Sequence, residues 1–217
     1  MSTVGGSLSD LRKDYSRDVL DEREVDPNPI RQFAIWFEQA REVMSHEPNA
    51  MTVATASANC EPSARMLLLK EFDERGFVFY TSYISPKAHD LDENPRAALL
   101  FYWPELERQV RISGQAERLP REESDAYFQS RPRGSQIAAI VSRQSQPVES
   151  RQALADAFAE LEARYDGQPI PRPEHWGGYR VRPVWIEFWQ GRPNRLHDRI
   201  RYTRQPDGTW RIERLMP

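Results

Sequence analysis

The stretch GFVFYTSYISPKAHDLDENPRAALLFYW, residues 76–103, carries the pattern on which the fold prediction depends. The apolar runs at its two ends, residues 76–83 and 96–103, are typical of strands. Between them, Ser85 and Pro86 are favoured at the N-cap and the first position of a helix. A helix of about two turns is therefore expected between two strands.

Similar runs continue on both sides of this stretch and are separated by turn signals, so antiparallel strands are expected. The preceding runs are AMTVATAS (50–57) and SARMLLLKEF (63–72), and RQVRISGQAERL (108–119) follows. The chain ends in YRVRPVWIEFWQ (179–190), RLHDRIRYTRQ (195–205) and TWRIERLM (209–216). The last two runs flank PDG, which predicts a hairpin turn.

Helical periodicity appears before and after the central strands. PIRQFAIWFEQAREVMSH (29–46) has apolar residues on one face, and SRQALADAFAELEARY (150–165) repeats Leu154, Phe158, Leu161 and Tyr165 at helical spacing. The pattern predicts an α+β fold, with an antiparallel barrel-like sheet and flanking helices. We expect a flexible N-terminal segment over residues 1–20 and a single domain over residues 21–217.

Composition excludes several classes of protein. The 217 residues carry a net charge of −3, which disfavours a general nucleic-acid binder. No apolar run approaches the ~18 residues of a membrane span, and the N-terminus has no signal-peptide pattern. Cys60 is the single cysteine, so no intrachain disulfide is possible, and a reducing cytoplasm is the expected location. Phosphate-loop, nucleophile-elbow and metal-ligand motifs are absent.

Clusters of cations and hydroxyls indicate anion sites. Lys13, Lys70 and Lys87 are the only lysines among 30 basic residues. Lys70 ends RMLLLK (65–70), which is expected to be a buried strand. Lys87 lies in the first helical turn after Ser85, where an anion would contact both the lysine and the free N–H groups.

Two further cation clusters lie later in the chain. Tyr127, Arg131 and Ser135 follow at four-residue intervals, as on one helix face interrupted by Pro132. In NRLHDR (194–199), strand alternation would direct Arg195, His197 and Arg199 to one side. Solvated strand ends and polar helix faces remain alternatives for each cluster. Together the clusters predict two phosphate groups, one on a cofactor and one on a substrate.

Specific segments in family order carry a resemblance over residues 11–217. They are RMLLLK, FVFYT, NPRAALLFYW, LERQVRISGQAERL, YFQSRPRGSQIAA, SRQS, WGGYRV, IEFWQG and RLHDR. The sequence resembles the pyridoxine/pyridoxamine 5′-phosphate oxidase family. The resemblance implies an FMN-binding split barrel, a homodimer with FMN at the subunit interface, and no nucleic-acid or membrane partner. It also implies oxidation of pyridoxamine 5′-phosphate and pyridoxine 5′-phosphate to pyridoxal 5′-phosphate. Hydride passes to FMN, and O2 reoxidises the flavin to give H2O2.

The resemblance also implies the site residues. The FMN contacts would be Arg65, Met66, Leu67, Leu68, Leu69, Lys70, Tyr80, Thr81, Lys87, Gln109, Gln144, Ser145, Trp189 and Arg199. The substrate contacts would be Arg12, Lys13, Asp14, Tyr15, Lys70, Tyr127, Arg131, Ser135, Arg195, Leu196 and His197, with Arg195 and His197 beside the reacting ring as catalytic residues.

Two departures from the family pattern are visible. Pro86 stands where the family usually has arginine, which removes a cation near the flavin phosphate. Asp14 replaces a more usual glutamate. A split-barrel flavoprotein with another substrate and a non-enzymatic anion- or RNA-binding module remain the competing hypotheses. The net charge and the tryptophans within apolar strands disfavour the binding module.

Overall fold

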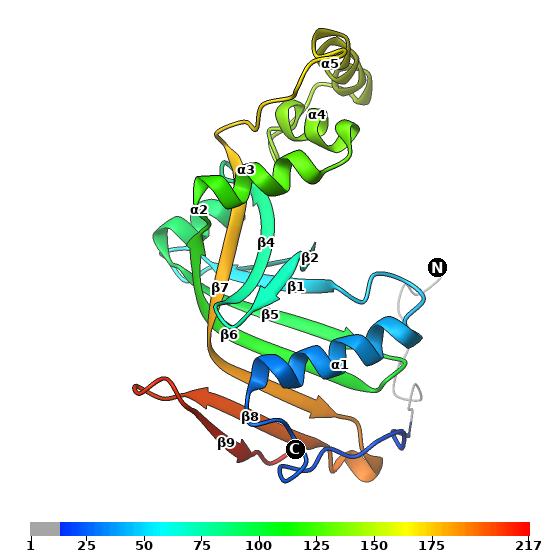
Figure 1. Cartoon of the computed structure of the whole chain (residues 1–217), viewed down its shortest axis with the longest axis vertical. Helices are drawn as coiled ribbons and strands as arrows, with labels where there is room; N and C mark the ends of the chain where they lie inside the picture. The colour runs from blue at the N-terminus through cyan, green and yellow to red at the C-terminus, as the bar shows by residue number, and fades with distance from the viewer. Residues whose placement is uncertain (1–13) are drawn as a thin grey trace, which may run out of the picture. The chain divides into compact units, whose positions relative to one another are not determined.

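The computed structural model describes residues 14–217, which form an antiparallel sheet and several helices (Figure 1). The helices are α1 (Pro29–Val43), α2 (Pro86–Glu93), α3 (Arg121–Ser130), α4 (Arg133–Val141) and α5 (Arg151–Arg164), with a 3-10 turn η1 (Pro193–Arg195). The strands are β1 (Ala50–Ala56), β2 (Pro62–Leu68), β3 (Glu71–Asp73), β4 (Gly76–Ser82), β5 (Arg96–Trp103), β6 (Arg108–Arg118), β7 (Trp176–Gln190), β8 (Asp198–Arg204) and β9 (Trp210–Arg214).

The chain forms two compact units. Unit 1 comprises the described residues up to Pro48, Tyr102–Val110 and Ile186–Pro217, and unit 2 comprises Asn49–Phe101 and Arg111–Trp185. The strands follow the order β2-β1-β5-β6-β7-β4-β3, and β8 pairs with β7 and β9. Antiparallel pairing is confirmed for β1 with β2 and β5, and for β4 with β3 and β7. The predicted α+β class is therefore confirmed.

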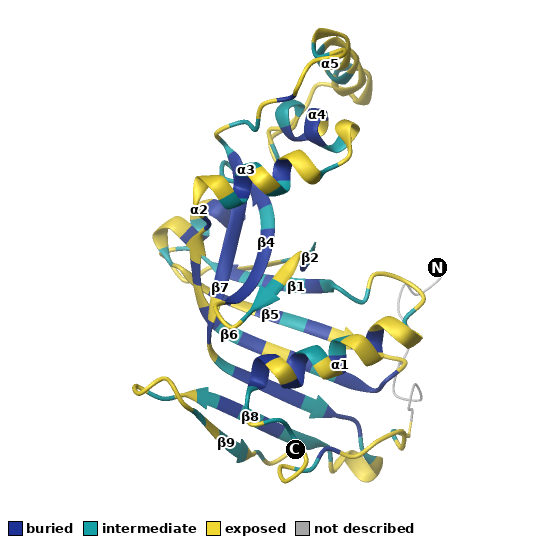
Figure 2. Ribbon diagram, in the orientation of Figure 1, coloured by how far each residue is buried: buried dark blue, intermediate teal, exposed yellow. Residues whose placement is uncertain are grey.

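Unit 2 places its helices beside the strands that bear the predicted site. β4 is buried along most of its length and pairs with the start of β7, so that Tyr80 lies opposite Gly178 (Figure 2). Gly178 leaves room for its neighbours, since a Cβ there would lie 2.4 Å from Leu119 and 2.8 Å from Tyr80. Phe128 of α3 and Ile137 of α4 form a core with Trp176. This core fixes the two helices next to the end of β4.

Unit 1 contains the helix predicted over residues 29–46, which the structure forms as α1 (Pro29–Val43). Asn28 caps α1 by accepting from the N–H of Ile30 at 2.8 Å, and Pro29 occupies the first turn. The buried face of α1 includes Phe33, whose ring lies 6.2 Å from that of Trp103. The β8–β9 hairpin is confirmed, and Gly208 takes the left-handed φ of 87° in its turn.

Three expectations about local structure are wrong. SARMLLLKEF forms two strands, β2 and β3, instead of one. RMLLLK is not a buried strand, because β2 lies at one end of the described sheet order and Met66 is 63% exposed. In NRLHDR, η1 and left-handed values of φ at Asn194 (56°) and Arg195 (62°) replace the predicted strand, which begins only at Asp198. Within residues 14–217, no helix has the length and apolar character needed to span a membrane.

Candidate functional site

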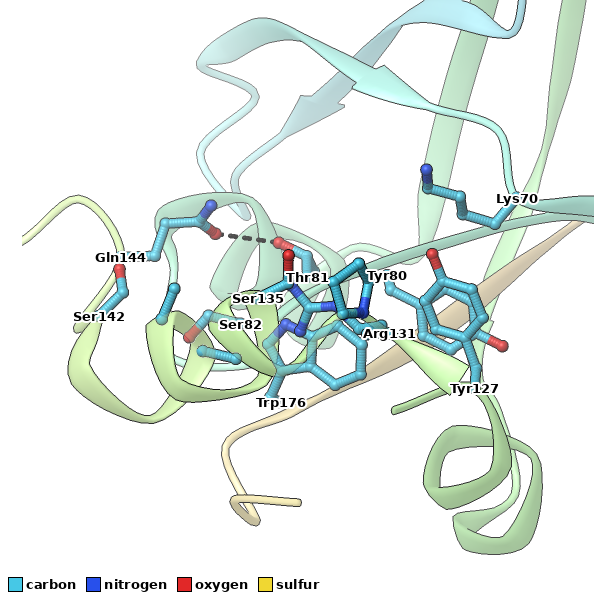
Figure 3. A pocket seen from close by; sticks show the side chains of 13 residues that line it. Lys70, Tyr80, Thr81, Ser82, Tyr127, Arg131, Ser135, Ser142, Gln144 and Trp176 are labelled. Carbon is cyan, nitrogen blue, oxygen red and sulfur yellow. Dashed lines mark hydrogen bonds between the residues drawn. The ribbon is translucent and has the colours of Figure 1, made fainter. Parts of the chain in front are cut away.

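The first cavity lies in unit 2 and has a volume of about 420 Å³ (Figure 3). β4 contributes Tyr80, Thr81 and Ser82, and the α3–α4 region contributes Tyr127 and Arg131. The remaining lining residues are Lys70, Pro132, Ser135, Ala138, Ala139, Ser142, Gln144 and Trp176. The structure therefore brings together Lys70, Tyr127, Arg131 and Ser135, which were predicted to bind the substrate phosphate.

Tyr127, Arg131 and Ser135 do not share one helix face, as their spacing had suggested. α3 ends at Ser130 and α4 begins at Arg133, with Arg131 and Pro132 between them. Pro132 lacks the N–H that a continuous helix would use, and it limits the preceding residue to an extended conformation. Arg131 accordingly has φ −72° and ψ 149°. The break places a guanidinium between two helices that both line the cavity.

Parallel aromatic rings form one wall of the first cavity. The rings of Tyr80 and Tyr127 stack with centroids 3.8 Å apart, and Trp176 lies 5.5 Å from Tyr80 with an interplanar angle of 12°. The guanidinium carbon of Arg131 lies 4.5 Å from the Trp176 ring centroid, a cation–π arrangement. Burial raises the pKa of Tyr80 to about 12, so its hydroxyl remains protonated at neutral pH. The wall is suited to a planar ring beside an anion.

Arg131 has an unused hydrogen-bond donor at this wall. Its Nη1 is buried and has no hydrogen-bond partner in the part of the chain that the structure describes. Burial also lowers the pKa of the guanidinium. A buried N–H group without an acceptor is costly, and an oxyanion bound in the cavity would remove that cost.

Lys87 is a second cation with no acidic partner among residues 14–217. It is only 6% exposed, and its Nζ donates to Thr81 Oγ1 at 3.1 Å, Ser85 Oγ at 3.1 Å and Gln144 Oε1 at 2.9 Å. Burial, and then the charge of Arg65, lower the pKa of Lys87 to about 8. Buried charges in proteins are normally paired, so these neutral partners indicate a site for an anion.

The start of α2 differs in one detail from the prediction. Ser85 is the N-cap residue and Pro86 is at the first helical position, as expected. The Ser85 side chain does not cap the helix, however, because its hydroxyl donates to the carbonyl of Ser82 at 2.7 Å. The first-turn N–H groups thus have no side-chain cap.

Arg65 lies on β2 and is half-buried. Its Nη1 donates to Val53 O at 3.1 Å and to Thr55 Oγ1 at 2.9 Å. Burial lowers the pKa of Arg65, while the nearby Asp90 acts in the opposite direction. Thr55 in turn donates to Asp90 at 2.6 Å, which ties the arginine to α2.

The second cavity lies in unit 1 and has a volume of about 450 Å³. The predicted residues Asp14, Tyr15, Gln109, Trp189, Arg195 and His197 all line it, together with Tyr102, Arg192, Pro193 and Asn194. Tyr15 packs edge-on against Trp189, with ring centroids 5.8 Å apart, and against His197 at 5.7 Å. A turn, not the expected strand, thus presents Arg195 and His197 to one cavity.

The tautomer of His197 follows from a backbone contact. The N–H of Arg192 donates to His197 Nδ1 at 3.0 Å. A backbone amide can only donate, so the neutral ring carries its proton on Nε2. Burial and the charge of Arg195 lower the pKa of His197, which favours this neutral form. His197 can therefore offer one N–H donor from Nε2.

Arg199 has partners of its own in unit 1. Its Nε donates to Glu187 Oε1 at 2.9 Å, and its Nη1 donates to the carbonyl of Met216 at 2.9 Å. Glu187 is 1% exposed and also accepts from Arg201 at 2.9 Å. The predicted contact of Arg199 with a cofactor stays a prediction.

The remaining predicted residues have different environments. Leu69 is buried, Leu67 and Leu68 are half-buried, and Ser145 and Leu196 are exposed. Arg12 and Lys13 lie outside the described residues. Sequence reasoning missed Trp176, Ser82 and Arg192. The WGGYRV motif contained a signal for Trp176, because glycines beside an aromatic residue in a strand often mark close packing.

The antiparallel sheet and its flanking helices define a split-barrel class of fold. A solved structure described as a pyridoxamine 5′-phosphate oxidase-related, FMN-binding protein from Nostoc punctiforme shares the fold. Its TM-score is 0.71 at 18% identity, and the match covers 89% of this chain and 100% of the other.

The family is shown by sequence. Residues 37–165 match the family described as Pyridoxamine 5′-phosphate oxidase, and residues 176–217 match the Pyridoxine 5′-phosphate oxidase C-terminal dimerisation region. The chain belongs to the pyridoxamine 5′-phosphate oxidase family of oxidoreductases.

Similar relatives match over nearly their whole length. Pyridoxine/pyridoxamine 5′-phosphate oxidase of Rubrobacter xylanophilus is 60% identical over 97% of this chain and 96% of its own. The protein of the same name from Trichormus variabilis is 57% identical over 97% and 99%. A structure of PhzG from Burkholderia lata, in complex with tetrahydrophenazine-1-carboxylic acid, has a TM-score of 0.86 at 35% identity. That match covers 92% of this chain and 98% of PhzG.

Proposed function

We propose that the protein oxidises pyridoxamine 5′-phosphate and pyridoxine 5′-phosphate to pyridoxal 5′-phosphate with bound FMN. The observation that carries this proposal is the unpartnered Nη1 of Arg131 beside an aromatic wall. A phosphate would accept from Arg131, with Lys70 and Ser135 as further donors in the same cavity. The planar pyridine ring of the substrate would lie against Tyr127.

The residues around Lys87 fit the phosphate of FMN. Lys87 is a buried cation whose partners are neutral oxygens, and Arg65 is close enough to lower its pKa. Gln144 Oε1 accepts from Thr81 (Figure 3) and also from Lys87, so that its amide nitrogen points away from both donors. Pro86 supplies no cation, so Lys87, Arg65 and the start of α2 would hold the phosphate.

The second cavity supplies groups for the reacting ring. Arg195 would stabilise negative charge on the ring, and His197 would donate from Nε2 to an oxygen or nitrogen acceptor. When bound, FMN supplies hydride acceptance and reoxidation by O2 with release of H2O2. The chain's own residues bind and orient the substrate, and Tyr15 limits the access of water to His197.

We further propose a homodimer in which the first cavity of one copy and the second cavity of its partner form one site. The match of residues 176–217 to a dimerisation region supports this arrangement. His197 and Arg195 both lie within that region. The exposed single cysteine, Cys60, fits a reducing cytoplasm as the location.

Purified protein tests the proposal directly. We expect a yellow protein with about one FMN per chain that produces H2O2 and pyridoxal 5′-phosphate from either phosphorylated substrate. Unphosphorylated pyridoxine should be a poor substrate, because Arg131 would lack its anion. Equal efficiency on pyridoxine and pyridoxine 5′-phosphate would refute the assigned phosphate site.

A second candidate is an FMN enzyme that oxidises a different, carboxylate-bearing ring compound. The 35% identity to PhzG, whose structure holds tetrahydrophenazine-1-carboxylic acid, favours this candidate. The same assay separates the two. A flavin-loaded protein that leaves both phosphorylated substrates unchanged would support the second candidate.

A further inference from the structure

The two backbone N–H groups that follow Tyr15 donate to one carboxylate, that of Glu107. Oε2 of Glu107 accepts from the N–H of Ser16 at 3.0 Å and from the N–H of Arg17 at 3.1 Å. Glu107 is 6% exposed and has the left-handed φ of 56°. A charged acceptor shared by two consecutive amides fixes the direction in which the chain leaves Tyr15.

The backbone of Glu107 also holds the other wall of the second cavity. Its carbonyl accepts from the N–H of Gly191 at 2.8 Å. Gly191 immediately precedes Arg192, whose N–H binds His197. One residue therefore connects the Tyr15 segment, through its side chain, to the segment that contains His197, through its backbone.

Gly191 leaves the space that the Tyr15 ring fills. A Cβ at Gly191 would lie 2.7 Å from Cγ and 2.8 Å from Cδ1 of Tyr15, closer than real side chains approach. Gly191 is not among the described glycines with a positive φ, so its backbone conformation does not exclude alanine, and the three atoms nearest to the alanine Cβ would all belong to Tyr15. The glycine is thus explained by the ring that covers it.

We infer that Glu107 and Gly191 are positioning residues that set Tyr15 against Trp189 and His197. Glu107 fixes the backbone after Tyr15, and Gly191 provides the surface on which the ring packs. Neither residue needs to contact the substrate. The expected change in KM rests on the proposed function, whereas the expected position of Tyr15 does not.

Amide hydrogen exchange of the flavin-loaded protein tests the structural part without any activity. In a peptide covering residues 14–18, Glu107→Leu should speed exchange by roughly tenfold or more per lost hydrogen bond, and Glu107→Gln should restore most of the protection. Gly191→Ala should also speed exchange there. Gly134→Ala is the matched control, because its Cβ would meet only Phe158, at an ordinary 3.8 Å. Unchanged exchange in both Glu107→Leu and Gly191→Ala overturns the inference.

A double-mutant cycle tests the kinetic part. Gly191→Ala should raise KM for pyridoxine 5′-phosphate several-fold in the native background. It should change KM less than about twofold in the Tyr15→Ala background, because the clash has been removed. Equal effects in the two backgrounds would show that Gly191 acts independently of Tyr15 and would overturn the inference. If no variant or native protein oxidises the substrate, the proposed function fails while the exchange result still stands.

Discussion

Replacing Lys87 by methionine should stabilise the flavin-free protein while weakening its hold on FMN. The pKa of Lys87 falls from 10.5 to about 8 on folding, which corresponds to about 3 kcal/mol of cost for the charged form. Methionine keeps a flexible apolar stem and has no charge. The former acceptors keep other roles, since Thr81 still donates to Gln144 and Ser85 still donates to Ser82. We expect the free energy of unfolding at pH 7 to rise by about 1–3 kcal/mol.

The pH dependence of this gain has a definite sign. The folded-state pKa lies below the unfolded one, so between pH 8 and pH 10.5 the unfolded state binds more protons. The unfolding free energy of the native sequence therefore increases relative to that of the variant between pH 8 and pH 10.5. The difference between the two unfolding free energies should shrink as pH rises. FMN affinity of the variant should be lower by roughly 10- to 150-fold, as for one charge-assisted hydrogen bond.

Urea unfolding of both flavin-free proteins at fixed protein concentration, from pH 7 to pH 10, measures the gap. Lys70→Met is the matched control, because Lys70 is exposed and lines the first cavity together with Thr81 and Gln144, two hydrogen-bond partners of Lys87. Its unfolding free energy should stay within about 0.5 kcal/mol of the native value. The interpretation of Lys87 as a buried charge that binds an anion would be refuted by either of two results. In one, Lys87→Met has a lower free energy of unfolding than the native protein at pH 7. In the other, the difference in unfolding free energy stays constant up to pH 10.

Three further predictions concern the proposed site. Arg131→Ala should raise KM for pyridoxine 5′-phosphate by roughly 10- to 150-fold with unchanged FMN content, and steady-state kinetics with flavin absorbance would check both. At substrate concentrations well below KM, where Arg131→Ala and Arg195→Met should each be nearly inactive, an unfolded and refolded equal mixture of the two chains should recover about a quarter of native activity if two copies share each site. It should recover no more than the separate variants if one copy supplies both arginines. Pro86→Arg should tighten FMN by roughly 2- to 12-fold, as for one added hydrogen bond, and a gain of several orders of magnitude in a titration would contradict the assignment of Lys87 and Arg65 as sufficient phosphate donors.

Local sequence patterns predicted the helices and most strands, because the spacing of apolar residues in each element reflects the face that is buried. The helix at Pro29–Val43 and the strand at Gly76–Ser82 are examples. The patterns failed where tertiary position overrides composition. RMLLLK is apolar enough for a core strand, yet it lies at the end of the sheet order, and only pairing decides that. NRLHDR alternates like a strand, but the left-handed conformations of Asn194 and Arg195 cannot be read from charge alternation.

The sequence predicted which residues belong to the candidate site, but it did not predict which of them line the same cavity. Spacing and resemblance gave Tyr127, Arg131 and Ser135, which do line one cavity. The separation of Arg195 and His197 into a second cavity depends on which segments far apart in the chain pack together. Trp176 was missed because its contact with Arg131 joins residues that are remote in sequence.

The division of unit 1 among three chain segments has a consequence for synthesis on the ribosome. Its first segment ends at Pro48, but its last begins at Ile186, about 140 residues later. At roughly 5–20 residues per second, those residues take about 7–28 s to be made. During that interval the apolar face of α1, with Phe33 and Trp36, has no C-terminal strands to complete its unit. We therefore expect nascent chains stopped before residue 186 to bind holdase chaperones through this helix, and chains released at full length to be free of them.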